Sequence, residues 1–337
     1  MGMGPPAELG MSMEIENRVM FSWSHGQRAL LAFMALLFFV TPAGAEPALI
    51  LIDEVKLAKL LPPLEGVKKL EASGVAAHGE QLYIVFDNID QVGRIAHTLR
   101  PHPTNGWLEL QSAHEGFEGI AVEADGRISV VVEQDRKKQA HLLSWLAEPR
   151  LHTDAPIHAD GMRRFRVENK GYEGMAIHHH QGEESLFLLC EGNRCMDDGG
   201  EPQGVIHRYI RNERQGPWRF GETLSLKGLA DFKDYSGLAI DDQGRIAVVS
   251  QKDAKVWIGQ LLADGQIESR GIYTIDESRF GEGAGQGRRL CGNKRAKKRV
   301  YKRIEGVSWL GRERLVMVSD KEKKSCKSQA VHLFRIP

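Results

Sequence analysis

Short hydrophobic runs separated by Gly, Asp and Asn turns make up most of the chain after residue 45, and helical periodicity is scarce. Apolar runs bounded by turn residues are typical of β-strands. Five of these runs open with the same signature, a Ser or Glu followed by Gly and an apolar strand. The five dipeptides begin at Ser73, Glu118, Glu173, Ser236 and Glu305.

A turn and a second apolar strand follow each dipeptide, and the dipeptides are spaced 45, 55, 63 and 69 residues apart. Repeats of roughly 40–50 residues are typical of β-propeller blades, and propellers contain about 4–8 four-stranded blades. The additional residues lie in loops, mainly 195–203 and 278–303. The pattern predicts an all-β fold, a five-bladed β-propeller. A β-sandwich of similar strand number is the alternative, which the regular repeat disfavours.

The last repeat has only three clear strands before Pro337, whereas residues 48–53 form an apolar run outside the five repeats. Pairing this run into the fifth blade would cover the strand edges that a sheet otherwise exposes. We therefore expect a propeller closed by pairing of its N-terminal and C-terminal strands. It would form a single domain over residues 46–337.

The N-terminal segment has the pattern of a secretory signal. Arg28 precedes twelve apolar residues, 29–40, and the segment then ends in Ala43-Gly44-Ala45. We predict a signal peptide over residues 1–45 and a periplasmic or secreted protein. The apolar run is shorter than the roughly 20 residues of a bilayer span. An uncleaved anchor is therefore the less favoured alternative, and no stable membrane span is expected after cleavage.

The charge balance limits the classes of partner, and the cysteine content bears on disulfide formation. The 45 basic and 45 acidic side chains balance, so we expect no nucleic-acid partner. An oxidising compartment permits disulfides, and four cysteines allow three pairings. We predict the pairs Cys190–Cys195 and Cys291–Cys326. The sequence has no Cys-x-x-Cys, which argues against a cysteine zinc site. It does not indicate an oligomeric state.

The five Ser and Glu residues are candidate metal ligands. The first strand of each propeller blade lines the central channel, so these side chains should converge. Three neighbouring carboxylates cannot all ionise without a compensating charge, which a divalent cation supplies. An all-oxygen ligand set favours Ca²⁺, because Mg²⁺ usually keeps several waters. We predict a Ca²⁺ site at Ser73, Glu118, Glu173, Ser236 and Glu305; the alternative is that these dipeptides are ordinary polar turns.

The order Ser, Glu, Glu, Ser, Glu at these positions resembles the axial calcium ligands of the calcium-activated nucleotidase (apyrase) family, which are also five-bladed propellers. The Glu-Gly-apolar-Ala strand, followed by a strand ending in Asp or Glu, resembles the phytase-like and SdiA-regulated propeller domains of exported bacterial proteins. The likeness covers nearly the whole mature chain as a repeat pattern, and it implies a calcium site and hydrolysis of phosphate esters. The Trp-, Tyr- and Arg-rich segments of the apyrases have no counterpart here, which argues against nucleotide hydrolysis.

A second set of polar residues ends the second strand of each repeat, at the same end of the channel as the metal ligands. Its acidic members could activate a water molecule for attack on a substrate, or they could simply be turn residues. The candidate catalytic residues are Asp87, Glu133 and Asp320.

A basic stretch over residues 288–303 contains nine cations and ends two residues before Glu305. At the channel mouth it would attract an anionic small molecule such as a phosphate ester. The alternative is a solvated surface loop. The candidate substrate-binding residues are Arg295, Lys298, Arg299, Lys302 and Arg303.

Two functions follow, and the sequence does not decide whether the chain is an enzyme. One is an exported calcium-dependent phosphate-ester hydrolase. The other is a non-catalytic binding or scaffold propeller in which calcium only fastens the blades together. An open pocket shared by the basic stretch and the second acidic set would favour the hydrolase.

Overall fold

The computed structural model describes residues 46–337 apart from 111–113, 115, 134–138, 146–151, 158–164, 166–170, 181, 191–203, 214–215, 277, 281–286, 291–300 and 322–324. The predicted signal peptide, residues 1–45, lies outside this range. Residues 46–337 form one compact unit. In the part of the chain just defined, no helix has the length and apolar character needed to cross a membrane.

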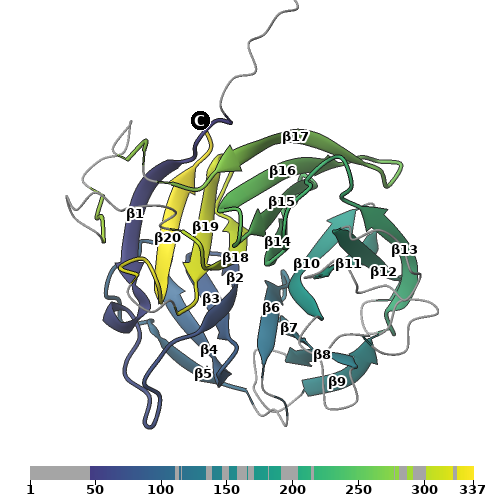
Figure 1. Ribbon diagram of the computed structural model, residues 1–337. Coiled ribbons are helices and arrows are strands. Elements are labelled where there is room, and N and C mark those ends of the chain that lie inside the picture. The colour runs from purple at the N-terminus through teal and green to yellow at the C-terminus, as the bar shows by residue number, and fades with distance from the viewer. Residues whose placement is uncertain are drawn as a thin grey trace, which may run out of the picture. The chain divides into compact units, whose positions relative to one another are not determined.

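The described strands form five four-stranded antiparallel sheets placed around a central axis (Figure 1), so the predicted five-bladed propeller is confirmed. Blade 1 contains β2 (Ala72–His78), β3 (Gln81–Phe86), β4 (Ile89–Ala96) and β5 (Gly106–Glu109). Blade 2 contains β6 (Phe117–Val122), β7 (Ile128–Val132), β8 (Ala140–Trp145) and β9 (His152–Ile157). Blade 3 contains β10 (Tyr172–His180), β11 (Glu183–Cys190), β12 (Val205–Arg211) and β13 (Arg219–Ser225). Blade 4 contains β14 (Gly237–Ile240), β15 (Arg245–Ser250), β16 (Lys255–Leu261) and β17 (Ile267–Thr274).

Blade 5 joins the two ends of the chain, as predicted. It contains β18 (Ile304–Trp309), β19 (Arg314–Ser319), β20 (Ala330–Arg335) and, as its outer strand, β1 (Ile50–Lys56), which a short 3-10 helix over Leu57–Lys59 follows. Strand β1 runs antiparallel to β20, from the pair Ile50–Arg335 to the pair Lys56–Ala330. The segment before β1 also hydrogen-bonds to the end of β17, because Leu49 N donates to Thr274 O at 3.0 Å. The β-sandwich alternative is thereby excluded.

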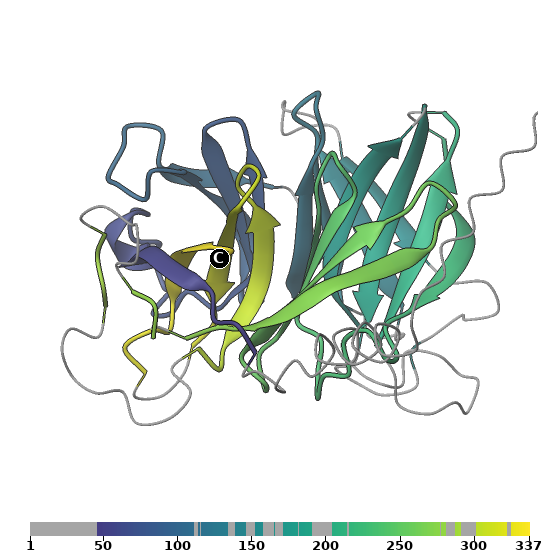
Figure 2. The same cartoon turned by 90° about the horizontal axis from the view of Figure 1, so that it is seen from above.

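The blades stack through their faces, which accounts for the continuous apolar runs in the sequence. Strands β7, β11, β15 and β19 lie between neighbouring strands of their own sheet and are covered on both faces. Residues such as Val130, Val131 and Val132 are therefore all buried, without polar alternation. One hydrophobic cluster between blades 1 and 2, for example, joins Val85 to Ile120 and Trp145. Figure 2 shows the sheets from the side, with strands running between the two ends of the ring.

The inner strands β2, β6, β10, β14 and β18 contact one another around the axis. The glycine after each Ser or Glu makes this approach possible, because a side chain there would enter the backbone of the next blade. A Cβ on Gly119 would lie 2.7 Å from the backbone N of Met175, and one on Gly174 would lie 2.6 Å from that of Leu238. The same close approach to a neighbouring blade occurs at all five glycines, which we call the glycine ring: Gly74, Gly119, Gly174, Gly237 and Gly306.

Candidate metal centre

The five predicted metal ligands lie at one end of the ring, where the inner strands begin; we call it the acidic end. Each is the second residue of its strand, except Ser236, which directly precedes β14. Ser73, Glu118 and Glu173 line a small axial cavity together with the glycine ring. Its volume is about 10 Å³, close to the space that one water molecule needs. The cavity therefore has room for a single ion or water.

A β-bulge places the ligand side chain in four of the five blades. The pairing of β6 with β7 shifts register between Phe117 and Gly119, so Glu118 has no partner residue opposite it. The same shift occurs at Glu173 and at Glu305, and at Ser73. Bulges redirect side chains next to functional sites. The repeated Ser/Glu-Gly dipeptide is therefore the sequence signature of a repeated bulge at the axis.

Glu118 is the most buried of the axial carboxylates, with 7% of its surface exposed. The described residues supply no hydrogen-bond donor to its carboxylate. Burial raises the pKa of Glu118 well above its usual value, and the charges of Glu173, Asp87, Glu305 and Glu133 raise it further. Negative charge therefore accumulates at this point, and a cation would relieve it.

The two axial serines fasten neighbouring blades together. Ser73 Oγ donates a hydrogen bond to the carbonyl of Phe117 in blade 2, and Ser236 Oγ donates one to the carbonyl of Ile304, at 2.9 Å, in blade 5. A hydroxyl that donates its hydrogen to a carbonyl keeps its oxygen lone pairs for another partner. Both serines can therefore bond the next blade and still offer oxygen to an axial ion.

The axial carboxylates are not drawn tightly together in this structure. Among the described residues, the groups that bring three ligand atoms within 4.8 Å of one another are His114, His141, Asp154 and Glu123, His179, Glu184. Neither contains an axial residue. An ion at the axis would therefore have to pull the glutamates inward or be reached partly through water, which Ca²⁺ tolerates because its coordination is flexible.

The three predicted catalytic residues also lie at the acidic end, directly after β3, β7 and β19. Partial burial, and the charge of Glu71, raise the pKa of Asp87. Glu133 Oε1 accepts a hydrogen bond from the backbone N of Gly171 at 3.0 Å, which ties blade 2 to the segment entering blade 3. Of the three, Glu133 thus has a clear structural role.

Asp320 has the environment most suited to chemistry. Its Oδ1 is buried without a hydrogen-bond partner among the described residues. Burial raises the pKa of Asp320, and the charges of Glu71 and Asp87 add to the effect, whereas the backbone N–H of Lys321 and the charge of Arg303 oppose it. The backbone N of Asp320 donates to Arg303 O at 2.9 Å, so these two residues are adjacent.

The basic stretch leads from the outer edge of blade 5 to the acidic end. Near its start, Arg288 pairs with Asp53 on β1, with Nη2 lying 2.9 Å from Oδ2. At its other end, the exposed Arg303 donates to Gln251 Oε1 at 3.3 Å. Lys302 is also exposed. The other predicted substrate-binding residues, Arg295, Lys298 and Arg299, lie outside the described residues.

The disulfide predictions also fall partly outside the structure's described range. Cys190 is buried at the end of β11, and Cys326 lies shortly before β20. Cys195 and Cys291 are not among the described residues. The pairs Cys190–Cys195 and Cys291–Cys326 therefore stay predictions.

A buried polar network connects β1, β19 and β20 where the ring closes, and the sequence did not predict it. His332 on β20 contacts Glu54 Oε2 through Nδ1 at 3.0 Å and Ser319 Oγ through Nε2 at 3.1 Å. The order Ser, His, Glu has the connectivity of a hydrolase triad. All three residues are nearly or fully buried, however, and Lys327 pairs with the same Glu54 carboxylate. We therefore assign this network to stabilisation of the closure between β1 and β20.

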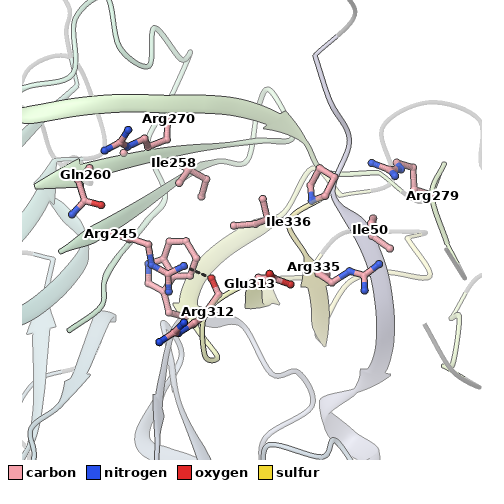
Figure 3. Close-up of a pocket in the computed structure, with 13 residues that line it drawn as sticks. Ile50, Arg245, Ile258, Gln260, Arg270, Arg279, Arg312, Glu313, Arg335 and Ile336 are labelled. Carbon is pink, nitrogen blue, oxygen red and sulfur yellow. Dashed lines mark hydrogen bonds between the residues drawn. The ribbon is translucent and has the colours of Figure 1, made fainter. Parts of the chain in front are cut away.

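A larger cavity, of about 610 Å³, lies between blades 4 and 5 (Figure 3). Arg245 stacks on the ring of Trp309 at 4.2 Å and pairs with Asp241 at 2.5 Å. Five arginines from distant segments meet here, a convergence that no local sequence signal announces. The charged residues that line the cavity are Arg245, Arg270, Arg279, Arg312, Arg335 and Glu313.

Comparison with known proteins finds solved structures that are similar to this chain. No protein-family model matches the chain, and no curated protein matches it. A glutaminyl cyclase of Myxococcus xanthus is 12% identical, covering 86% of this chain and 98% of that chain with a TM-score of 0.48. A PQQ-bound aldose sugar dehydrogenase of Streptomyces coelicolor is 13% identical, covering 86% and 99% with a TM-score of 0.45. A putative gluconolactonase is 12% identical, covering 78% and 73% with a TM-score of 0.40. The propeller assignment rests on the five sheets themselves, and the activities in these names belong to those proteins.

Proposed function

We propose that this chain is an exported calcium-binding propeller in which one Ca²⁺ ion at the acidic end fastens the five blades together. The supporting observation is Glu118, a buried carboxylate without a hydrogen-bond donor among the described residues. It lies where the blades meet and is surrounded by four other carboxylates. Glu118, Glu173 and Glu305 would be the charged ligands, with Ser73 and Ser236 adding neutral oxygens.

The small size of the axial cavity favours a structural role for the ion over catalysis at the axis. A space of about 10 Å³ admits an ion or a water and no organic substrate. The candidate ligands come from all five blades, and both serines already bond to the next blade. An ion held there would bridge elements far apart in sequence, so its binding energy would stabilise the whole ring.

Thermal unfolding of the purified protein in Ca²⁺ and in EGTA tests the proposal. A ligand that binds only the folded state stabilises it by about 2.7 kcal/mol at a hundredfold excess over Kd. For a protein of this size that corresponds to a rise in Tm of roughly 4–5 °C. The rise should disappear in Glu173→Gln and persist in Glu109→Gln, which alters an exposed carboxylate on β5. An equal Tm in Ca²⁺ and EGTA would rule the site out.

Export forms part of the proposal and is tested separately. Cleavage after Ala45 would give a mature protein that begins at Glu46. N-terminal sequencing of the protein from the periplasm or the medium should find that residue. Recovery of an intact N-terminus from the membrane fraction would support the uncleaved anchor instead.

Asp320 supports a second candidate function, calcium-dependent hydrolysis of a phosphate ester. Its buried Oδ1 has no hydrogen-bond partner among the described residues, and its raised pKa suits a proton acceptor. The neighbouring Arg303 could bind a phosphoryl oxygen. Hydrolysis of p-nitrophenyl phosphate should then require Ca²⁺ and fall at least a hundredfold in Asp320→Asn, but not in Glu109→Gln. If Ca²⁺ stabilises the protein but p-nitrophenyl phosphate is not hydrolysed, only the non-catalytic function is supported.

A further inference from the structure

Two histidines and an aspartate from separate segments of blade 2 form a compact cluster. His114 Nε2 lies 2.8 Å from Asp154 Oδ2, and His141 Nδ1 lies 2.8 Å from Asp154 Oδ1. The two imidazole centroids are 4.4 Å apart, and one ligand atom from each residue falls within 4.8 Å of the other two. The cluster is partly exposed, so solvent ions can reach it.

The strand order brings these side chains to the outer part of the acidic end. His141 lies on β8 opposite Val132, the residue that precedes Glu133. His114 lies two residues before Gly116, whose carbonyl accepts the backbone N–H of Glu133 at 3.3 Å. Asp154 comes from β9, the outermost strand of the blade. The cluster therefore lies at the same end of the ring as the axial site but farther from the axis, and it shares no residue with that site.

We propose that His114, His141 and Asp154 form a second metal site, specific for Zn²⁺ or a similar transition metal rather than Ca²⁺. Two imidazole nitrogens and one carboxylate are a donor set that Zn²⁺ accepts and that Ca²⁺ and Mg²⁺ seldom use. Among the described residues these three supply the ligands, which leaves the fourth tetrahedral position for another group. Such a position takes a water molecule or a substrate atom, and zinc can lower the pKa of a bound water to about 7.

The present contacts need only a small adjustment to admit the ion. Zinc–nitrogen bonds of about 2.0–2.1 Å in a tetrahedron separate ligand atoms by roughly 3.3 Å. The two 2.8 Å contacts involve different oxygens of Asp154. The carboxylate must therefore turn to present one oxygen to the ion, at about that tetrahedral separation from both ring nitrogens. Without an ion the carboxylate accepts hydrogen bonds from both rings. Burial favours the protonated form of Asp154, but the hydrogen bonds from His141 and His114 outweigh it and lower the pKa of Asp154.

The other candidate cluster is a poorer metal site because arginine already occupies it. Arg211 pairs with both Glu123 and Glu184, so a guanidinium supplies the positive charge that a metal ion would bring. In the blade 2 cluster, the groups that contact Asp154 are the imidazoles of His114 and His141, and imidazole nitrogen is itself a common metal ligand.

Cobalt titration of the purified protein, prepared without a histidine tag and stripped with EDTA, tests the proposal. Four-coordinate Co²⁺ absorbs visible light far more strongly than six-coordinate Co²⁺. We expect one equivalent to give the strong spectrum, Zn²⁺ to abolish it and excess Ca²⁺ to leave it unchanged. Loss of one of three ligands should weaken binding at least tenfold, both in His141→Ala and in Asp154→Asn, whose exposed position preserves the fold.

Two control variants separate this site from the other acidic groups. Glu173→Gln removes an axial carboxylate, and His179→Ala removes a member of the arginine-filled cluster. Both should bind Co²⁺ with wild-type affinity and the same spectrum. A weak six-coordinate spectrum, or strong binding that survives in His141→Ala and Asp154→Asn, would overturn the proposal whether or not the axial calcium site exists.

Discussion

Gly306 and Gly74 meet where the last blade joins the first: a Cβ on Gly306 would lie 2.8 Å from the Cα of Gly74. The atom in the way is backbone, which cannot rotate aside. The ring can therefore close at the axis only if this position lacks a side chain.

Replacing Gly306 by Ala should destabilise the protein by about 1–3 kcal/mol, because overpacking forces the backbone of two blades apart. Chemical denaturation measures the change in the free energy of unfolding. Gly106→Ala is the matched control, since a Cβ there meets nothing within 4 Å. Equal effects of the two substitutions would mean that the glycine ring does not limit the approach of the blades.

Glu118→Gln should change the stability of the protein in opposite directions with and without calcium. In EGTA at neutral pH the variant should be more stable, because burial and the neighbouring charges of Glu173 and Asp87 raise the pKa of Glu118 and penalise its ionised form. In Ca²⁺ it should be less stable, because a charged ligand is lost. The Tm values under both conditions measure these changes.

The pH dependence of the same pair of proteins gives a second test of Glu118. Because its pKa is higher in the folded state, calcium-free wild type should lose stability as the pH rises above about 4.5. The slope relative to Glu118→Gln should reach at most about 1.4 kcal/mol per pH unit. Parallel profiles for the two proteins would show that Glu118 remains ionised at neutral pH in the folded state.

Glu54→Gln should weaken the closure between β1 and β20. Burial opposes ionisation, yet His332 and Lys327 lower the pKa of Glu54 to about 2. Removing the charge leaves Lys327 buried without its carboxylate, which costs about 3–5 kcal/mol. Because this carboxyl has a lowered pKa, its contribution is complete above about pH 4.5 and is lost as the pH falls toward 2. Denaturation at pH 7 and pH 3 should show a smaller difference between the two proteins at pH 3.

Arg211→Met should destabilise blade 3 and its contact with blade 2. The guanidinium pairs with Glu123 at 2.8 Å and stacks on Trp218 at 4.2 Å, and Glu123 is 3% exposed. Removing Arg211 should cost up to about 3–5 kcal/mol, because the other cation beside Glu123, Arg127, lies farther away, with Nε 3.7 Å from Oε1. A double variant that adds Glu123→Gln should recover much of the loss. Failure to recover would show that the loss comes from Glu184 or from the packing on Trp218 rather than from Glu123.

Sequence reasoning placed the blades and the axial residues because both depend on local pattern. A Ser-Gly or Glu-Gly dipeptide lies at the start of each inner strand, and Glu118, Glu173 and Glu305 occupy equivalent positions in their repeats. The position of a side chain along its strand determines at which end of the ring it lies. Residues at equivalent positions of the five inner strands therefore lie at the same end, around the axis. The bulge that redirects them was not predicted, because register depends on the partner strand.

Other features had no local signal at all. His114, His141 and Asp154 come from a loop and two different strands. The pairing of Glu54 with His332 joins the two ends of the described chain. Their meeting depends on loop lengths, strand twist and the closure of the ring, which no window of sequence contains.

The sequence by itself thus determined the number of blades, the closure by β1 and the set of residues gathered at the acidic end, because hydrophobic period and turn residues act over a few positions. Only the tertiary structure decided which polar groups touch. Ser73 bonds to the next blade, Glu133 is held by a backbone amide, and Asp320 keeps a buried oxygen without a described partner. Such contacts depend on distances of a few tenths of an ångström between segments far apart in the chain, and packing of the whole ring sets those distances.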